Sequence, residues 1–114
     1  MRTLIRTQEF DDFYKSLPDN AKKKLDYVLS IASEIKVVNE QFVKQIVGTE
    51  FYELRVQVGN EYRVVVFTID HLNFAEATQV LLLNGFMKKS KKDYKPATDQ
   101  ARRILNRYND ENKD

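Results

Sequence analysis

The side chains of this sequence that could support chemistry are mainly cations and a phenol. Two arginines lie in segments that alternate between apolar and polar residues, two lysines follow an apolar run, and a tyrosine lies in the basic stretch beyond: Arg55, Arg63, Lys88, Lys89 and Tyr94. Together they could bind and strain a phosphodiester. Such a site would stabilise charge on the phosphate and move the proton through a lysine of lowered pKa or a tyrosine. RNA carries its own nucleophile, the 2′-hydroxyl, so an RNase is feasible with these residues.

The carboxylates near the two arginines allow more than one interpretation. Arginine in a half-buried strand needs a partner, which here is Glu53, Glu61 or an external anion. A bracing ion pair is therefore the structural alternative to a phosphate contact. Glu53 and Glu61 could also act across a hairpin as acid and base, but we expect ordinary exposed strand carboxylates. The only histidine, His71, lies in an expected turn, where we expect a solvated side chain.

The composition excludes several classes of site. The chain has no cysteine, which excludes disulfides, thiolate metal sites and cysteine nucleophiles. A single histidine excludes a multi-histidine metal site and argues against a Ser-His-Asp triad. The three glycines lack the spacing of a nucleotide-binding loop. No carboxylate cluster suited to metal-assisted DNA cleavage is evident, so we expect neither a metal nor another cofactor.

The length and the apolar content predict one domain in the cytoplasm. The chain has 114 residues, of which 42% are hydrophobic, and this suits a single core. No apolar run approaches the roughly 18 residues of a membrane span, and Met1–Arg6 is too short and too charged for a signal peptide. We expect a domain over residues 1–109, a polar tail over residues 110–114 and no membrane contact.

Positive charge is concentrated in residues 86–107. This stretch has eight Lys and Arg residues against two Asp, whereas the whole chain has a net charge of +2. Such clustering is typical of proteins that bind a phosphate backbone or an acidic protein, although a solvated helix face is the common alternative. The candidate RNA-binding residues of this stretch are Lys91, Lys92, Lys95, Arg102 and Arg103.

The apolar periodicity predicts the elements that would position these residues. A short strand over Thr3–Arg6 precedes two amphipathic helices that meet near Pro18 in an antiparallel hairpin. Their apolar stripes are Phe10, Phe13, Tyr14 and Leu17, then Leu25, Val28, Leu29, Ala32 and Ile35. Residues 39–50 are expected to form an irregular connection.

The second half of the chain predicts an antiparallel three-strand meander and a last helix. Residues 51–58 alternate, residues 61–69 are β-branched and aromatic, and a turn follows over residues 70–73. The apolar run Val80–Leu83 predicts a central strand covered on both faces, closed by Gly85. After a basic loop that contains Tyr94, Pro96 opens a helix that ends near Tyr108. The fold class is therefore α+β, with helices packed on a largely antiparallel sheet.

Four short motifs follow one another in a specific order. They are Phe-Tyr-Glu-Leu-Arg over Phe51–Arg55, Tyr-Arg-Val over Tyr62–Val64, the strand exit over Leu81–Ser90 and Ala-Arg-Arg within Gln100–Arg103. The four in register resemble the HigB-like, phage-derived branch of the RelE/ParE toxin superfamily. The resemblance covers residues 46–108, and the predicted order of elements matches the RelE-like fold.

This resemblance implies a toxin of a type II toxin–antitoxin pair. HigB and RelE toxins cleave mRNA in the ribosomal A site with basic and aromatic residues on the sheet. The implied partners are the ribosome, mRNA and a cognate antitoxin, expected to be a helix-turn-helix protein. The positions matched by the motifs are Arg55, Arg63, Phe86, Lys88 and Lys89. For Phe86, core packing is the alternative to a role in the site.

The sequence departs from the family pattern after the central strand. Ser90 stands where the family usually has threonine, and Asn84 where it often has histidine. Lys92–Tyr94 replaces the family's Lys-Thr-Pro, with the proline displaced to Pro96. If the family's histidine assists catalysis, Asn84 would weaken it.

The turn at Gly59–Asn60 decides whether the two arginines share one site. A strict two-residue turn, with glycine first as a type II′ turn requires, pairs Val58 with Glu61 and sends Arg55 and Arg63 to opposite faces. A three-residue loop or a bulge shifts the pairing by one residue and puts both on one face. We predict the shifted register, because the resemblance groups these cations on the open face of the sheet.

The sequence therefore predicts a ribosome-dependent, metal-independent mRNA endonuclease that inhibits translation. Two alternatives use the same fold. One is a toxin that poisons DNA gyrase, and the other is an inactive module that only binds its antitoxin.

Overall fold

The chain folds around one five-stranded sheet. The computed structural model describes residues 1–113, and its strands lie in the order β1-β5-β4-β3-β2. β1 runs parallel to β5, and all other neighbours are antiparallel. The predicted α+β class is confirmed. The elements in chain order are β1 (Thr3–Arg6), α1 (Gln8–Ser16), α2 (Asp19–Glu34), β2 (Val43–Gln45), β3 (Tyr52–Val58), β4 (Asn60–Thr68), β5 (Gln79–Lys88), the 3₁₀ turn η1 (Lys91–Asp93) and α3 (Tyr94–Glu111).

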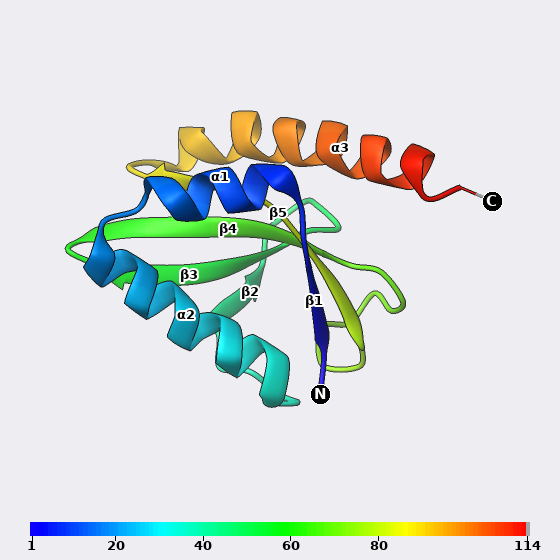
Figure 1. Ribbon diagram of the computed structural model, residues 1–114, viewed down its shortest axis with the longest axis horizontal. Coiled ribbons are helices and arrows are strands. Elements are labelled where there is room, and N and C mark those ends of the chain that lie inside the picture. Colours follow the sequence, from blue (N-terminus) through cyan, green and yellow to red (C-terminus); the bar gives the residue numbers. More distant parts are fainter. Residues whose placement is uncertain (114) are drawn as a thin grey trace.

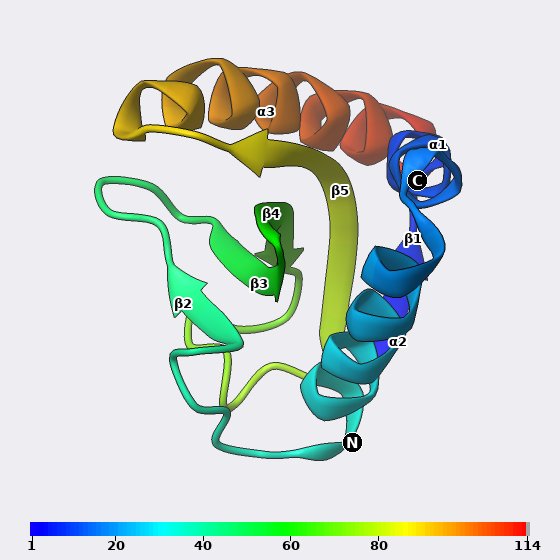
Figure 2. The same ribbon diagram turned by 90° about the vertical axis from the view of Figure 1, so that its left-hand side faces the viewer.

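Helices cover both faces of the sheet, as Figures 1 and 2 show. α1 and α2 enclose one core against the sheet, and α3 encloses a second core on the opposite face. Val80 and Leu82 of β5 lie in the first core, and Leu81 and Leu83 lie in the second. The apolar run Val80–Leu83 therefore forms a central strand covered on both faces, as predicted.

The two N-terminal helices form an open hairpin. Thr7 caps α1 by accepting a hydrogen bond from Phe10 N at 3.2 Å, and Pro18 is the N-cap residue of α2. From this junction α1 packs on β5 and α2 on β3, so the helices diverge (Figure 1). Tyr14 Oη donates a hydrogen bond to Asp26 Oδ1 at 3.0 Å and links them.

Gly85 lies within β5 and does not close the strand as predicted. A Cβ atom at this position would come within 2.3 Å of ring carbons of Phe13. Glycine therefore permits the close approach of α1 to the strand, and β5 continues to Lys88.

The expected irregular connection over residues 39–50 contains strand β2. Val43 pairs with Leu54 and Gln45 pairs with Tyr52. A three-residue strand is too short to show a strand period in the sequence. Hydrogen bonding to the free edge of β3 decides its conformation instead.

The β3–β4 hairpin has the shifted register. Val58 pairs with Asn60, and Arg55 pairs with Arg63. Gly59 alone occupies the tip, at φ 70°, a conformation that favours glycine. Since directly paired residues share a face, the two arginines lie on the same face, as predicted.

A β-bulge in β5 decides which side chains at the C-terminal end of this strand lie on the same face as the two arginines. Between the pair of Val66 with Leu82 and the pair of Val64 with Gly85, two residues of β5 lie opposite one residue of β4. The extra residue reverses the alternation of faces along β5. As a consequence, Lys88 lies on the same face as the two arginines.

The β4–β5 connection begins with the predicted turn. Asp70 accepts hydrogen bonds from Thr78 Oγ1, from Thr78 N at 3.0 Å and from Gln79 N at 3.1 Å. The hydroxyl of Thr78 and these backbone groups lower the pKa of Asp70 from 3.8 to about 2. His71 is exposed, and its Nδ1 accepts a hydrogen bond from Asn73 N at 2.9 Å. It matches the expected solvated turn histidine.

α3 begins at Tyr94, directly after η1. Asp93 Oδ2 accepts hydrogen bonds from the backbone N–H of Lys89 at 2.7 Å and of Ser90 at 3.0 Å, and with Ser90 as the N-cap residue this forms the capping box of η1, which leads into α3. Tyr94 is therefore a helical residue and not a loop residue as predicted. Pro96, predicted to open the helix, is its third residue.

The C-terminal helix is longer than predicted. α3 continues through Asn109 to Glu111, so the polar tail expected over residues 110–114 begins inside its last turn, and Asp114 lies outside the described residues. Neither α3 nor any other helix within residues 1–113 is long and apolar enough to cross a membrane.

Candidate functional site

A groove opens between β2, β3 and the beginning of α3. Its volume is about 480 Å³. Among its lining residues, four are cations and one is an acid. The lining consists of Lys44, Gln45, Ile46, Val47, Glu53, Arg55, Lys88, Lys91 and Tyr94. Four residues singled out in the sequence, namely Arg55, Lys88, Lys91 and Tyr94, therefore meet in one groove.

Strand pairing brings the groove residues to one face of the sheet. Lys44 of β2 pairs with Glu53 of β3, and Glu61 of β4 pairs with Lys88 of β5. The row between them contains Arg55 and Arg63. Because directly paired residues share a face, these charges lie together on the face that α3 covers only in part.

Arg63 lies beneath the groove in a network of buried charges. Its side chain is only 2% exposed and its Nε lies 2.6 Å from Oε1 of Glu53, which is 5% exposed. Its Nη2 donates a hydrogen bond to Oε1 of Glu61 at 3.0 Å. Burial lowers the pKa of Arg63, but hydrogen bonds to Tyr94 and Glu61 outweigh it and raise the pKa overall. Arg63 is therefore saturated by protein partners, which fits the bracing ion pair considered above.

Glu53 is buried, which corrects the expectation of an ordinary exposed carboxylate. Its Oε1 accepts a hydrogen bond from Tyr94 Oη at 2.7 Å, and Arg55 Nε lies 3.9 Å away. This burial could not be predicted from the alternation of residues, because alternation alone does not reveal that β2 and α3 cover the face. Glu61, by contrast, is 41% exposed, and its pKa is lowered chiefly by the hydrogen bond from Arg63.

Tyr94 is held in its neutral form. Burial and the hydrogen bond to Glu53 raise the pKa of Tyr94, against a smaller opposing effect of Arg63. Its ring packs edge-on against Phe86, with centroids 5.6 Å apart. The phenol can therefore donate a hydrogen bond at neutral pH but cannot act as a base. Phe86 packs in the second core, in agreement with its packing alternative.

The lysines around the groove differ in their surroundings. Lys88 and Lys91 line the groove, whereas Lys89 is exposed outside the lining. Lys44 lies in β2, a strand that the sequence did not reveal, and adds a cation to the groove that the sequence analysis did not predict. A local signal for it was absent, because Lys44 reaches the site only through the pairing of β2 with β3.

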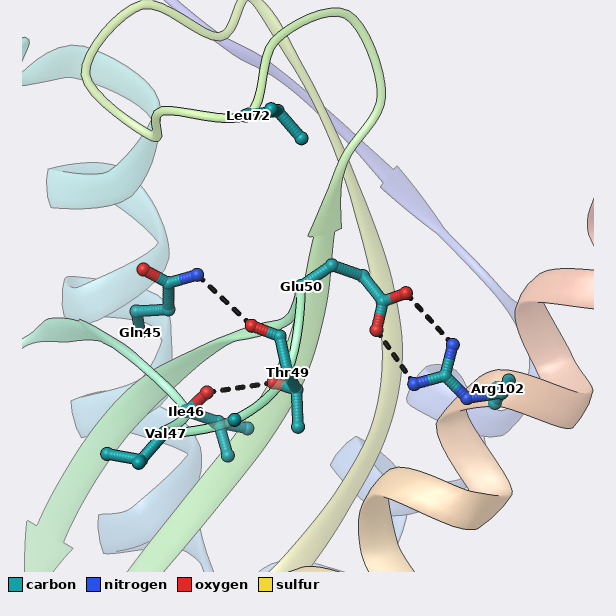
Figure 3. Close-up of a pocket in the computed structure, with 8 residues that line it drawn as sticks. Gln45, Ile46, Val47, Thr49, Glu50, Leu72 and Arg102 are labelled. Carbon is teal, nitrogen blue, oxygen red and sulfur yellow. Dashed lines mark hydrogen bonds and ion pairs between the residues drawn. The ribbon is translucent and has the colours of Figure 1, made fainter.

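Most of the predicted RNA-binding residues on η1 and α3 have acidic partners or lie away from the groove. Arg102 forms two hydrogen bonds with Glu50, at 2.8 and 2.9 Å (Figure 3). Lys95 Nζ lies 3.2 Å from Asp99 Oδ2. The other two, Lys92 and Arg103, are exposed and do not line the groove. Intramolecular pairing thus reduces the positive field that the sequence predicts for residues 86–107.

Asn84 does not reach the groove. Its Nδ2 donates hydrogen bonds to Ala97 O at 3.0 Å and to Gln100 Oε1 at 3.2 Å, and the side chain is buried between β5 and α3. The β5 bulge turns it toward the helix. Asn84 therefore fixes α3 to the sheet in this structure.

The arrangement can bind an anion and accept a proton. Ammonium and guanidinium groups surround an opening whose floor has a carboxylate hydrogen-bonded to a neutral phenol. Within residues 1–113, no group of three or more histidine, aspartate and glutamate side chains is placed to hold a metal ion.

Comparison with known proteins agrees with this fold. The chain resembles E. coli RelE from the intact RelBE toxin–antitoxin complex, with 15% identity and a TM-score of 0.60 over 79% of this chain and 100% of the other. A free E. coli RelE mutant has 16% identity and a TM-score of 0.61, with 90% of this chain and 95% of the other covered. The RelB–RelE complex from Methanococcus jannaschii has 20% identity and a TM-score of 0.54, with 81% of this chain and 99% of the other covered. No curated protein sequence matches the chain significantly. The profile of the phage-derived Gp49-like proteins (DUF891) matches residues 12–106. The chain therefore belongs to the Gp49-like family, the HigB-related, phage-derived branch of the RelE/ParE toxins, and has a RelE-like fold.

Proposed function

We propose that this protein is the toxin of a type II toxin–antitoxin pair and cleaves mRNA on the ribosome. The observation that carries the proposal is the groove in which Lys44, Arg55, Lys88 and Lys91 surround the buried Glu53. Membership of the Gp49-like family supports the toxin class. The cations suit a phosphodiester, and RNA supplies the nucleophile that the groove lacks.

Cleavage in this groove needs one proton acceptor and one proton donor. The 2′-oxygen of RNA attacks the adjacent phosphorus, and the bond from phosphorus to the 5′-oxygen breaks. Glu53 takes the proton of the 2′-hydroxyl, because it is the acid that lines the groove. Lys88 gives a proton to the leaving 5′-oxygen, while Arg55 stabilises the charge that develops on the phosphate. The products are a 2′,3′-cyclic phosphate and a 5′-hydroxyl.

Tyr94 and Arg63 act through Glu53 in this scheme. Tyr94 Oη and Arg63 Nε both lie at Oε1 of Glu53, at 2.7 and 2.6 Å. They hold the carboxylate in one orientation. The two residues are thus positioning residues, in place of the direct catalytic roles expected from the sequence.

In-vitro translation with toe-printing tests the proposal. The wild type should produce cleaved mRNA in the presence of ribosomes, and the cleavage should be lost when ribosomes are omitted. Glu53→Gln should reduce the cleavage rate about 100-fold or more, the usual contribution of a general base. Its matched control is Glu61→Gln, which makes the same charge change in the same network outside the groove lining.

Two results would overturn this assignment. A wild type that leaves mRNA intact on active ribosomes would refute the nuclease, and a gyrase supercoiling assay would then separate a gyrase poison from an inactive antitoxin-binding module. Full cleavage by folded Glu53→Gln would remove Glu53 from the reaction. Circular dichroism of both variants establishes that they are folded.

The partner expected from this function is an antitoxin that covers the groove. A helix-turn-helix protein with an acidic or amphipathic segment suits the half-buried Lys88 and the exposed Lys89 and Lys91. Hydrogen exchange of the complex should show protection at the end of β5 and the first turn of α3. A complex that blocks toxicity and leaves these amides unprotected would indicate inhibition from a remote surface.

A further inference from the structure

A second hollow continues the groove along α3. It has a volume of about 720 Å³ and is lined by residues 45–50 together with Leu72 and Arg102 (Figure 3). Both openings share Gln45, Ile46 and Val47 as a common wall. The groove borders Tyr94 and the hollow borders Arg102, and this part of a helix spans about 12 Å at 1.5 Å per residue. The two openings therefore lie in succession along one helix.

The hollow has exposed apolar side chains at its opening and the guanidinium of Arg102 in its wall. Val47 and Leu72 are 91% and 84% exposed, so two large apolar side chains stand in solvent at the same opening. Arg102 is held 5.2 Å from the centroid of Phe51 and forms a bidentate pair with Glu50, whose side chain is 38% exposed. The hollow thus offers an apolar surface for the face of a base and a guanidinium fork for a phosphate, two features that suit single-stranded RNA.

We propose that this hollow binds a nucleotide of single-stranded RNA next to the one cut in the groove, and that its phosphate displaces Glu50 from Arg102. The assignment rests on the proposed function for its biological role, but RNA binding can be measured without cleavage. The base would cover Val47 and Leu72.

Arg102 can readily exchange the carboxylate of Glu50 for an RNA phosphate. An exposed ion pair is weak and is easily exchanged, and the arginine fork matches phosphate as well as carboxylate. The ring of Phe51 stays under the guanidinium after the exchange and keeps Arg102 in place. Glu50 thus acts as a stand-in for the phosphate in the free protein.

The first test removes the competing acid. The probe is a fluorescent 2′-O-methyl RNA of about six nucleotides, which lacks the nucleophile and fits the usual range of single-strand sites. Glu50→Gln frees Arg102, so the full-length variant should bind about fivefold more tightly than the wild type at 0.1 M salt, with a slope of log K against log salt steeper by about 0.7. The control Glu34→Gln makes the same charge change at an exposed position of α2 that lines neither the groove nor the hollow.

A second pair of variants tests the rim independently. Val47→Asp places a negative charge at the wall shared by the groove and the hollow. This charge repels the RNA phosphates and should weaken binding of the probe by about fivefold or more. Its control, Val37→Asp, changes a residue that is 76% exposed and lines neither opening. Both positions are exposed, so neither variant should disturb the core.

The outcomes separate this inference from the proposed function. If Glu50→Gln binds no more tightly than Glu34→Gln, or Val47→Asp no more weakly than Val37→Asp, the hollow is not an RNA site and remains a surface for a protein partner. If both differences appear while the wild type fails to cut mRNA, the RNA site stands and the nuclease proposal falls. A wild type with no measurable affinity for the probe refutes the RNA site directly.

Discussion

Replacing Arg63 with methionine should destabilise this fold strongly. The charged atoms of Arg63 and Glu53 lie 2.6 Å apart and both side chains are almost inaccessible, so the substitution leaves a buried carboxylate without its cation. Removing one partner of such a pair costs about 3–5 kcal/mol. We expect about 3 kcal/mol, at the lower end, because Tyr94 Oη still donates to Glu53 and Arg55 lies 3.9 Å away. For a chain of this size the melting temperature should fall by about 12 °C.

Urea unfolding followed by circular dichroism measures this loss through linear extrapolation of the free energy of unfolding. The double variant Arg63→Met/Glu53→Met removes both charges and replaces them with apolar groups. It should recover much of the stability, because an apolar replacement of a buried ion pair is often neutral. Glu61→Gln should have a smaller effect than Arg63→Met, because Glu61 is exposed. The reasoning fails if Arg63→Met is as stable as the wild type, or if the double variant is no more stable than the single one.

Three further perturbations test other parts of the structure. In the translation assay, Lys88→Ala should slow cleavage about 100-fold, whereas Lys89→Ala should have a smaller effect because Lys89 lies outside the groove lining; equal effects would contradict the assignment. Gly85→Ala should cost about 1–3 kcal/mol in urea unfolding through overpacking, and adding Phe13→Leu should recover part of it, since ring carbons of Phe13 lie 2.3 Å from the new Cβ. The pKa of Asp70 is lowered to about 2 in the folded state, so its contribution to stability is present above the unfolded pKa and is lost as the pH falls through the folded one. Between about pH 4 and pH 2, the free energy of unfolding of the wild type should therefore fall more steeply with decreasing pH than that of Asp70→Asn. Parallel curves of the free energy of unfolding against pH would refute this role of Asp70.

Local periodicity determined most of the fold. The helical stripe that includes Phe10, the alternation after Phe51 and the apolar run Val80–Leu83 each predicted an element that the structure contains. These patterns succeed because the side chains of one helix or strand repeat over a few residues and face the same core. Where the segment was too short for a period, as in β2, or where the capped 3₁₀ turn η1 led directly into the helix, the prediction missed the element or its boundary.

The candidate site was predicted in part, because its residue types are local but its geometry is not. The motifs identified Arg55 and Lys88, the chemistry of the basic stretch singled out Tyr94, and all three line the groove. The burial of Glu53 depends on β2 and α3, which join it from distant parts of the chain. A strand pattern shows which residues alternate and cannot show what covers them.

Tertiary structure alone decided which charges are available to a ligand. Arg102 pairs with Glu50 and Arg107 with Glu9, and these partners lie 52 and 98 residues away in the sequence. A one-residue bulge in β5 decided that Lys88 faces the groove. The sequence by itself determined the number of cations and most of the elements that hold them, with β2 as the exception. Their pairing, burial and direction depend on contacts between strands and helices far apart in the chain, which no local pattern encodes.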